Sequence, residues 1–410
     1  MALNIVWIAF FVIAFVIALI KFFFLGDVEI FKTLTDGIFD SATTSVTQVA
    51  FPLAGTMVFF LGLMKIAEKA GAIAKLAKIL NPFMRRLFPE VPQNHPAMGE
   101  MVMNFSANML GLDNAATPFG LKAMESLQQL NPQKEQASNA QIMFLVLHTS
   151  GLTLIPLSII AYRLAAGSHE AASIFIPCVL GTVFTTLMAI LITGFKQKIK
   201  WDFVLVGWLL AIFAIIVGLL IGVGTMSAAG KEIFSKIAGS LVLLLVIILI
   251  IVAGAYKKVS VFDTFIDGAK EGWVIVVKII PYLVGMLVAI RVFRDCGALG
   301  YLTDGIGYLI HAMGFNTDFV PSLPVAIMKP FSGSGARGLM IDTMQTFGPD
   351  SFVGKLACTF NGSADTTFYI IALYFGSVGI KKVRYAVWVG LAADILGVIG
   401  AIIIGYIFFH

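Results

Sequence analysis

One polar stretch in the second half of the chain runs Met328-Lys329-Pro330-Phe331-Ser332-Gly333-Ser334-Gly335-Ala336-Arg337-Gly338. It lies among segments that are apolar enough to sit in a lipid bilayer. Pro330 and the glycines argue against one continuous helix. Non-helical backbone survives at membrane depth only where protein buries it or where it lines a wet cavity. We therefore interpret the stretch as the tip of a re-entrant hairpin that faces a polar site.

A second stretch of this kind lies in the first half and runs Asn104-Phe105-Ser106-Ala107-Asn108-Met109-Leu110-Gly111-Leu112-Asp113-Asn114-Ala115-Ala116-Thr117-Pro118. It also places glycine, proline and polar side chains inside an apolar region. Two such interruptions at corresponding positions of two halves are typical of the binding site of a transporter.

The composition is that of a membrane protein. Of the 410 residues, 59% are hydrophobic and only 12% are charged, with a mean hydropathy of +0.94. A soluble domain carries roughly twice that charged fraction. Apolar runs of spanning length cover residues 3–25, 45–66, 140–164, 173–195, 203–225, 236–256, 273–293, 354–376 and 384–408. Runs 140–164 and 354–376 place glycine within a polar segment, which predicts locally unwound helices.

Several classes of function lack support in the sequence. The net charge of +5 is modest and fits lysines that hold loops in the cytoplasm, so we expect no nucleic-acid partner. No phosphate-cradling loop occurs, which argues against an ATP-driven pump. The three cysteines have no metal or disulfide spacing, and the serines and histidines form no catalytic motif. We therefore expect no enzyme, no metal site and no cofactor, apart from Na⁺ or H⁺ as a coupling ion.

Short matches recur along the two halves. Residues 31–37 agree with residues 262–268 at four of seven positions, and Gly71 corresponds to Gly297. Further along the chain, Ser150 and Thr153 correspond to Ser363 and Thr366. The order of the matches is constant, and the separation between matched positions shrinks steadily along the chain. A duplication with shorter loops in the second copy predicts this pattern.

The basic residues predict the orientation of the chain. Lysines and arginines follow the second, fourth, sixth and eighth apolar runs, and the positive-inside rule places all four groups in the cytoplasm. This threads the chain with its N-terminus inside and its C-terminus outside. The second copy then starts five spans after the first, so the copies are inverted. Arg291 and Arg294 fall on the outer side, against the rule, beside Asp295 and Asp304.

The sequence thus predicts an all-α polytopic membrane protein built on an inverted-topology repeat, with about nine transmembrane helices, two re-entrant hairpins and two broken helices. We expect the first repeat at 1–200, with its hairpin at about 97–125 and its broken helix at about 140–164. Connecting helices follow at 201–256. The second repeat is expected at 257–410, with its hairpin at about 320–347 and its broken helix at about 354–376.

Four polar clusters are expected to converge on a solute. The expected substrate-binding residues are Asn104, Ser106, Asn108, Asn114, Thr117, His148, Thr149, Ser150, Thr153, Ser332, Gly333, Ser334, Arg337, Asn361, Ser363 and Thr366. The expected coupling-ion residues are Asp365, Asp113 and Thr367. Unwound backbone adds free amide and carbonyl groups, and half-helix ends add partial charges that hold ligands.

Structural roles remain open for several of these residues. Arg337 either pairs with Asp365 or Asp113 as an internal bridge, or binds an anionic group of a solute, since a guanidinium suits a carboxylate or phosphate. His148 is expected to be a hydrogen-bonded packing residue rather than a proton carrier. The hydroxyl groups can also bond helix to helix. Glu125 and Asp342, near the hairpin ends, are expected to be solvated.

Specific motifs add a family resemblance. The first half resembles the spore maturation protein A family at residues 95–99, 114–125 and 148–156. The second half resembles the spore maturation protein B family at residues 279–284, 330–338 and 361–367. Together they cover about nine tenths of the chain, which looks like a fusion of the pair. Both families are grouped as nucleoside recognition or gate domains, which are similar in plan to concentrative nucleoside transporters. That plan implies inverted repeats, two hairpins, two broken helices and often a trimer. The chain lacks the hairpin and broken-helix glutamates of those transporters.

The leading hypothesis is a secondary transporter of a small polar solute, anionic or nucleoside-like, working by alternating access around a midplane site between the two hairpins. The rival is a non-transporting scaffold or gate protein of the cell envelope that assembles with partner proteins. We expect a multi-pass protein of the bacterial cytoplasmic membrane that contacts lipid and forms a homo-oligomer, either a dimer or a trimer.

Overall fold

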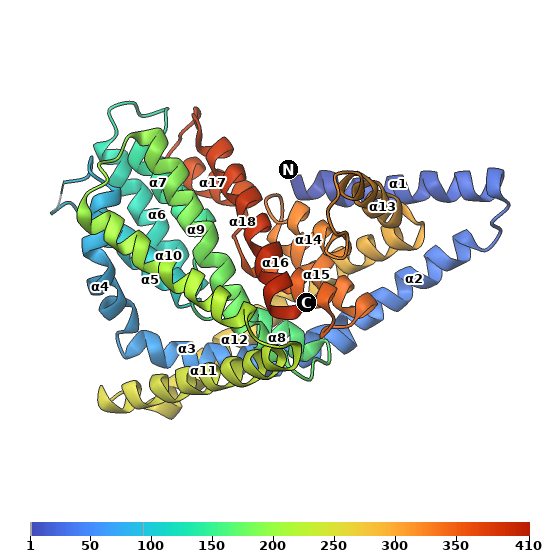
Figure 1. The fold of residues 1–410 in the computed structure, drawn as a ribbon, viewed down its shortest axis with the longest axis horizontal. Helices are drawn as coiled ribbons and strands as arrows, with labels where there is room; N and C mark the ends of the chain where they lie inside the picture. Colours follow the sequence, from blue (N-terminus) through green and yellow to red (C-terminus); the bar gives the residue numbers. More distant parts are fainter. Residues whose placement is uncertain (1, 93) are drawn as a thin grey trace. The chain divides into compact units, whose positions relative to one another are not determined.

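The chain is an all-α membrane protein. The computed structural model describes residues 2–92 and 94–410, and the side chains within them except those of residues 2, 3, 6, 113–115, 228, 229, 232, 235, 236, 278 and 279. In chain order the α-helices are α1 (Ala2–Leu25), α2 (Ile30–Thr44), α3 (Phe51–Lys69), α4 (Ala72–Leu87), α5 (Pro96–Met109), α6 (Asp113–Leu130), α7 (Asn139–Thr149), α8 (Leu157–Ala165), α9 (Phe175–Gln197), α10 (Phe203–Gly224), α11 (Ala228–Tyr256), α12 (Val261–Asp295), α13 (Ala298–Ala312), α14 (Leu323–Met328), α15 (Gly333–Phe347), α16 (Phe352–Gly362), α17 (Thr367–Ser377) and α18 (Ala386–Phe409). Figure 1 shows their course along the chain.

Seven helical runs in the described residues are long and apolar enough to cross a membrane. They are Trp7–Leu25, Ile30–Lys69, Ala171–Gln197, Phe203–Gly224, Ile237–Tyr256, Val261–Asp295 and Ala386–Phe409. The two other runs expected from the sequence, 140–164 and 354–376, are each divided into two short helices. Ser150 to Pro156 separate α7 from α8, and Ser363 to Thr366 separate α16 from α17.

The chain forms two compact units that interleave along the sequence. The first unit consists of residues 1–62, 158–171 and 267–361, and the second of residues 63–157, 172–266 and 362–410. Each unit contains one helical hairpin and one half of each divided run. In the first unit the hairpin is α14–α15 and the halves are α8 and α16. In the second unit the hairpin is α5–α6 and the halves are α7 and α17. Each unit therefore includes residues of both segments that were expected to be repeats.

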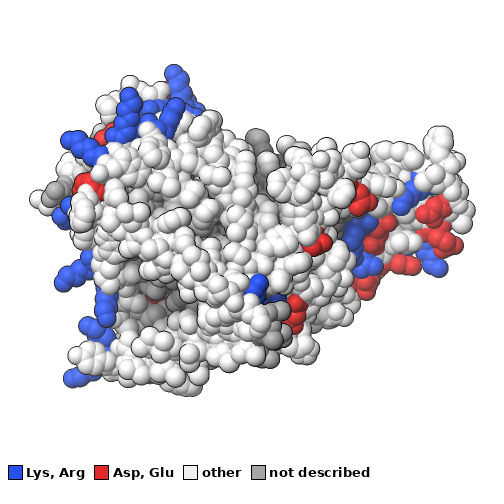
Figure 2. Space-filling view, viewed as in Figure 1, with Lys and Arg blue, Asp and Glu red and all other residues white. Residues whose placement is uncertain are grey.

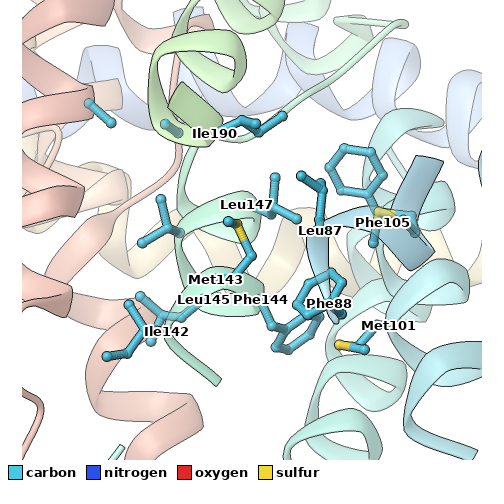
Figure 3. Packing of buried hydrophobic residues seen from close by; sticks show 14 of the residues in the cluster. Leu87, Phe88, Met101, Phe105, Ile142, Met143, Phe144, Leu145, Leu147 and Ile190 are labelled. Carbon is cyan, nitrogen blue, oxygen red and sulfur yellow. The ribbon is translucent and has the colours of Figure 1, made fainter. Parts of the chain in front are cut away.

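The core of the second unit surrounds α7. Every residue of this helix after Asn139 is buried, as expected for a helix that is apolar on all sides. Figure 3 shows Met143, Phe144 and Leu147 of α7 in one cluster with Phe105 of α5 and Ile190 of α9. Helix α18 lies against α9, where a side chain on Gly397 or Gly400 would collide with Thr185 or Phe184.

The first unit is held by α12 and the second hairpin. Apolar residues of α1, α2, α12 and the start of α13 form one buried cluster. Helix α15 packs directly on α12, because a side chain on Gly338 would lie 2.9 Å from Ile290. Helix α16 contacts the other end of α15, where Cys358 lies beside Met344.

Both hairpin tips are shorter than the sequence indicated. Asn104, Ser106 and Asn108 are helical in α5 and Pro118 is helical in α6, so residues 110–112 alone form the first tip. In the second hairpin, Pro330 lies in the turn as expected, but Gly333 to Gly338 are helical because Ser332 caps the N-terminus of α15 through the amide of Gly335. A serine cap lets a glycine-rich segment begin a helix rather than a loop.

Corresponding helices of the two halves begin at positions whose spacing agrees with that of the matched residues in the sequence. Helices α7 and α16 are both 11 residues long. The sequence separation between their first residues, Asn139 and Phe352, equals the separation between the matched residues Ser150 and Ser363. The first residues of α2 and α12 are as far apart as the earliest match, between residues 31 and 262. Gly71 and Gly297 both adopt left-handed backbone, with φ of +82° and +93°, immediately before α4 and α13. The division of the chain into inverted repeats itself stays a prediction.

The four basic stretches that set the predicted orientation all belong to the second unit. They are residues 65–86, 196–200, 257–258 and 381–384. Each of three basic residues in these stretches contacts a residue of another segment of the unit. Arg86 forms an ion pair with Asp202 at 3.1 Å, Lys196 lies 5.9 Å from the ring centroid of Tyr385, and Lys69 donates to the hydroxyl of Thr264 at 3.4 Å. Figure 2 shows lysine and arginine gathered along one edge of this unit, beside a largely uncharged face.

Candidate functional site

The two chain interruptions meet in the second unit through backbone atoms. The amide nitrogen of Asp365 donates to the carbonyl oxygen of Thr149 across 2.8 Å. Gly151, with φ of +62°, lies against the same segment, and a Cβ at this position would be 2.8 Å from the nitrogen of Asp365. Only glycine combines this left-handed conformation with so close an approach.

The tip of the first hairpin joins this crossing. The amide of Leu154, in the segment after α7, donates to the carbonyl oxygen of Met109 at 2.8 Å. Gly111, with φ of +70°, lies close to the carbonyl oxygen of Ile155. Three non-helical segments, from one hairpin and from both divided runs, therefore come together within one compact unit.

A buried polar network extends from the hairpin into the core. The Nδ1 atom of His148 lies 3.1 Å from Oδ1 of Asn104 and 2.9 Å from Nδ2 of Asn108. The hydroxyl of Tyr374 on α17 lies 3.4 Å from the same nitrogen. This nitrogen accepts from Asn108 in one tautomer of the imidazole and donates to Asn104 in the other. His148 is thus hydrogen-bonded within the core, and its role as a packing residue or as a substrate-binding residue stays a prediction.

Tyr374 is a member of this network that sequence reasoning missed. Its hydroxyl fits against Gly120 of α6, where a Cβ would collide with it. The amide of Asn104 donates to the carbonyl oxygen of Ala116 at 2.7 Å and thereby joins the two arms of the hairpin. Tyr374 lies in the opposite half of the sequence from His148, and nothing in its local sequence marks it as polar and buried.

The expected hydroxyl residues divide into two groups. Ser150 and Thr153 lie at the first interruption and contact α9, because Thr186 donates to the hydroxyl of Ser150 at 2.9 Å and Thr182 to the carbonyl oxygen of Thr153 at 3.2 Å. Ser106 instead donates to the carbonyl oxygen of its own helix, at Val102. Thr149 does the same at Val146.

Two carboxylates lie at the second interruption. Oδ1 of Asp365 accepts from the amide of Thr366 at 2.7 Å. The hydroxyl of Thr367, the first residue of α17, donates to Oδ2 of Asp394 at 2.6 Å. Asp394 is 7% exposed and belongs to α18, where it is the one charged residue of a membrane span. Its isolation in an apolar run was the signal that sequence reasoning overlooked, since such residues are retained for function.

The first unit carries a second polar cluster at the tip of the other hairpin. The hydroxyls of Ser332 and Ser334 lie 3.3 Å apart, and Nε of Arg337 donates to the carbonyl oxygen of Gly333 at 3.3 Å. Nζ of Lys329 donates to Oδ1 of Asn361 at 3.2 Å. Lys329 belongs to the polar stretch 328–338 but was not expected to be a site residue. It brings a second cation to the cluster that contains Arg337.

The remaining expected residues are placed only in part. Thr117 lies in α6 and Ser363 is buried at the second interruption. The side chains of Asp113 and Asn114 are outside the described residues. Arg337 belongs to the first unit and Asp365 to the second, so the pairing of these two residues stays a prediction.

A buried arginine clamps the base of the second hairpin. Arg163, at the end of α8, has no exposed side-chain surface and forms an ion pair with Asp350 at 2.7 Å. Asp350 also accepts from the hydroxyl of Ser168 at 2.6 Å and from the amide of His169 at 2.9 Å. Burial raises the pKa of Asp350, but these hydrogen bonds and the charge of Arg163 outweigh it and hold the pKa below its usual value.

Arg291 and Arg294, at the end of α12, are paired with acidic residues. Arg291 pairs with Asp295 at 2.6 Å and with Asp40 at 3.2 Å, and Arg294 pairs with Asp342. These pairs would offset the charge of both arginines if they lie on the outer side, as the predicted orientation requires. The expectation that Asp342 is solvated is wrong, because it is 6% exposed and bound to Arg294. Glu125 is exposed, as expected.

The acidic and imidazole groups of the described residues do not gather into a metal centre. Among the residues that the structure describes, no group of three histidine, cysteine, aspartate or glutamate side chains is arranged to hold a metal ion. The polar groups of the two clusters are mostly neutral amides and hydroxyls, together with Lys329, Arg337 and Asp365. Such groups hold a polar solute by hydrogen bonds and charge.

Comparisons with known proteins show the family of the chain. The family profile described as "Gate: Nucleoside recognition" matches residues 50–167 and 276–381, more than half of the chain. Spore maturation protein B of Bacillus subtilis (strain 168) is 48% identical over 155 residues, which are 38% of this chain and 85% of that protein. Spore maturation protein A of the same organism is 40% identical over 189 residues, which are 46% of this chain and 92% of that protein. The resemblance of the chain to a fusion of both is confirmed.

Proposed function

The chain belongs to the nucleoside recognition family of gate domains, and on this premise we propose that it is a secondary transporter of a small polar solute with an anionic or nucleoside-like group. It is a multi-pass membrane protein of a transporter-like family. The identity of the solute and the mechanism of transport belong to the proposal.

The crossing in the second unit supports this proposal most strongly. Thr149, Gly151 and Asp365 bring two unwound segments into backbone contact, and the hairpin tip at Met109 is bonded to the first of them. Unwound backbone within membrane spans is tolerated where protein buries it or where it lines a cavity. Divided helices and hairpins are the elements from which transporters build their solute and ion sites.

We assign roles according to charge. The cluster of Lys329, Ser332, Ser334, Arg337 and Asn361 binds the anionic group of the solute, since guanidinium and hydroxyl groups donate to oxyanions. The second unit offers Asn108 and the hydroxyls of the first interruption as neutral partners. Asp365 and Thr367, with Asp394 added by the structure, bind the coupling Na⁺ or H⁺.

The wider arrangement follows from the same proposal. Both hairpins contribute to a site that opens alternately to either side of the membrane, without catalysis. The edge of the second unit that carries the basic stretches is cytoplasmic, so the N-terminus lies inside and the C-terminus outside the bacterial cytoplasmic membrane. The protein forms a homo-oligomer, a dimer or a trimer.

A reconstitution experiment tests the proposal. The purified protein is inserted into proteoliposomes and uptake of a panel of labelled nucleosides, nucleotides and small organic anions is measured under Na⁺ or H⁺ gradients. We expect gradient-dependent uptake of at least one solute, lost in Asp365→Asn and retained in the matched variant Asp304→Asn, whose carboxylate is exposed on α13. Absence of uptake for every solute, or equal uptake by both variants, contradicts the proposal.

The rival function is a non-transporting scaffold of the cell envelope. It is favoured by the buried network of Asn104, Asn108, His148 and Tyr374, whose polar groups already satisfy one another. Thiol labelling separates the two functions because the native cysteines are all buried. A Ser150→Cys variant is expected to react with a membrane-impermeant reagent from at least one side if the protein transports, and from neither side if it is a closed scaffold.

A further inference from the structure

Two cationic side chains, Lys329 and Arg337, belong to the tip of the second hairpin, and Lys329 contacts an asparagine of α16. Lys329 contacts Oδ1 of Asn361, and Nδ2 of Asn361 lies 3.4 Å from the sulfur of Met340. Met340 and Arg337 are three residues apart on α15 and therefore share one face of this helix. Asn361 thus faces the side of α15 that carries Arg337, and its amide oxygen holds the ammonium group of Lys329.

The local fold keeps both cations at the tip. The amide of Ser332 donates to the carbonyl oxygen of Met328, so the chain from Lys329 to Gly333 makes one compact turn. Met328 also packs on the start of α15, since a Cβ at Gly335 would lie 3.0 Å from its side chain. The bond from Nε of Arg337 to Gly333 directs the guanidinium back toward the same turn.

From this arrangement we infer that the site takes a doubly charged oxyanion, namely a phosphate monoester. A phosphate monoester carries close to two negative charges at neutral pH and three acceptor oxygens. The guanidinium matches two of these oxygens, while the ammonium acts as a point charge on the third. The hydroxyls of Ser332 and Ser334 add donors, and the N-terminus of α15 adds positive potential.

The inference rests on the proposed function for its biological meaning but not for its test. A monoanion of the same shape carries half the charge and therefore gains about half the Coulomb attraction from the two cations. A sulfate monoester is such a monoanion. Preference for phosphate over sulfate monoesters is therefore larger at a two-cation site than at a single arginine.

The test measures binding to the full-length protein in nanodiscs of zwitterionic lipid. Phenyl phosphate and phenyl sulfate are titrated at about pH 7.5, above the second phosphate pKa of about 6. We expect phenyl phosphate to bind at least about tenfold more tightly. Lys329→Gln lowers this preference, Lys329→Arg retains it, and the control Lys381→Gln, in an exposed pair with Glu135, leaves it unchanged. Equal affinity for the two probes in the unaltered protein, or an unchanged preference in Lys329→Gln, overturns the inference.

Two further arms locate the source of the monoester and separate this inference from the proposed function. Nanodiscs that contain phosphatidic acid, a lipid with a phosphate monoester headgroup, compete with phenyl phosphate if the ligand is a lipid and do not compete if it is a soluble solute. Either result supports the inference when the preference depends on Lys329. Binding without uptake in proteoliposomes overturns the transport proposal alone. Gradient-driven uptake of a solute together with no phosphate preference overturns this inference alone.

Discussion

Gly151 lies so close to Asp365 that a Cβ on the glycine would be 2.8 Å from the aspartate amide nitrogen, although the two residues belong to opposite halves of the sequence. The contact brings together the interruptions of both divided runs within one compact unit. It is therefore a sensitive place at which to test whether the crossing holds the fold.

Replacing Gly151 by alanine should lower the stability of the protein by more than the cost of placing an alanine in a left-handed backbone conformation. A left-handed alanine costs about 1 kcal/mol, and here the methyl group also collides with the backbone of Ala364 and Asp365. Gly167→Ala is the matched control, because Gly167 has φ of +80° with nothing within 4 Å of its Cβ position. Melting temperatures in detergent should fall clearly further for Gly151→Ala. Equal losses would show that the two interruptions are not in contact.

Replacing His148 by alanine should leave buried polar groups without partners. Asn104, Asn108 and Tyr374 all lie within hydrogen-bond distance of the imidazole, and each buried group left unsatisfied costs about 1–3 kcal/mol. Thermal unfolding should therefore shift downward by several degrees, whereas His169→Ala, at an exposed position, should have little effect. A melting temperature as high as that of the control would contradict the network.

The clamp between Arg163 and Asp350 should give the protein a specific acid sensitivity. The pKa of Asp350 lies below its ordinary value of 3.8 in the folded state, so its stabilisation is complete above that value and is lost as the pH falls through the lowered pKa. The difference in melting temperature between the unaltered protein and Asp350→Asn should be constant above about pH 5 and shrink below pH 3.8.

The same clamp allows a check by double substitution. Asp350→Asn alone leaves Arg163 charged and fully buried, which costs about 3–5 kcal/mol in buried pairs of this kind. Arg163→Met combined with Asp350→Asn removes the uncompensated charge and should recover part of that loss. A double variant less stable than Asp350→Asn would mean that Arg163 acts mainly through its bonds to neighbouring carbonyl groups.

Asp394→Asn should uncouple transport from the driving ion. The amide keeps the size of the side chain and still accepts from Thr367, so the fold should be retained while the carboxylate charge is lost. In proteoliposomes we expect uptake driven by a Na⁺ or H⁺ gradient to vanish while binding of the solute persists. Gradient-driven uptake at the unaltered rate would exclude Asp394 from the coupling site.

The sequence predicted the interruptions but not their partners. Pro330, Pro156 and Gly151 mark breaks because their backbone requirements are local, and the structure divides the chain near each of them. The interruption expected from Asn104 to Pro118 was too long, since Asn104 and Ser106 are helical and their side chains donate to the carbonyl groups of Ala116 on α6 and Val102 on α5. A polar side chain within a helix need not indicate a loop when a nearby carbonyl group accepts its hydrogen bond.

Residues whose role depends on a distant contact were missed. Tyr374, Lys329, Arg163 and Asp394 are each defined by one partner elsewhere in the fold, and the partners of Tyr374 and Arg163 lie in the opposite half of the sequence. A lone carboxylate in an apolar run, as at Asp394, is the one signal of this group that sequence inspection offers. Asp342 shows the opposite error, because its position at a hairpin end predicted exposure while Arg294 holds it inside.

The interleaving of the two compact units has a consequence for how the protein is made. Neither segment 1–200 nor segment 257–410 contains all the pieces of one unit, so each unit is complete only when both segments are present. A single reading frame delivers both halves from one ribosome in equal numbers and at the same place in the membrane. Covalent fusion thereby replaces a bimolecular encounter, whose speed depends on the copy numbers of two gene products, with a search confined to one chain.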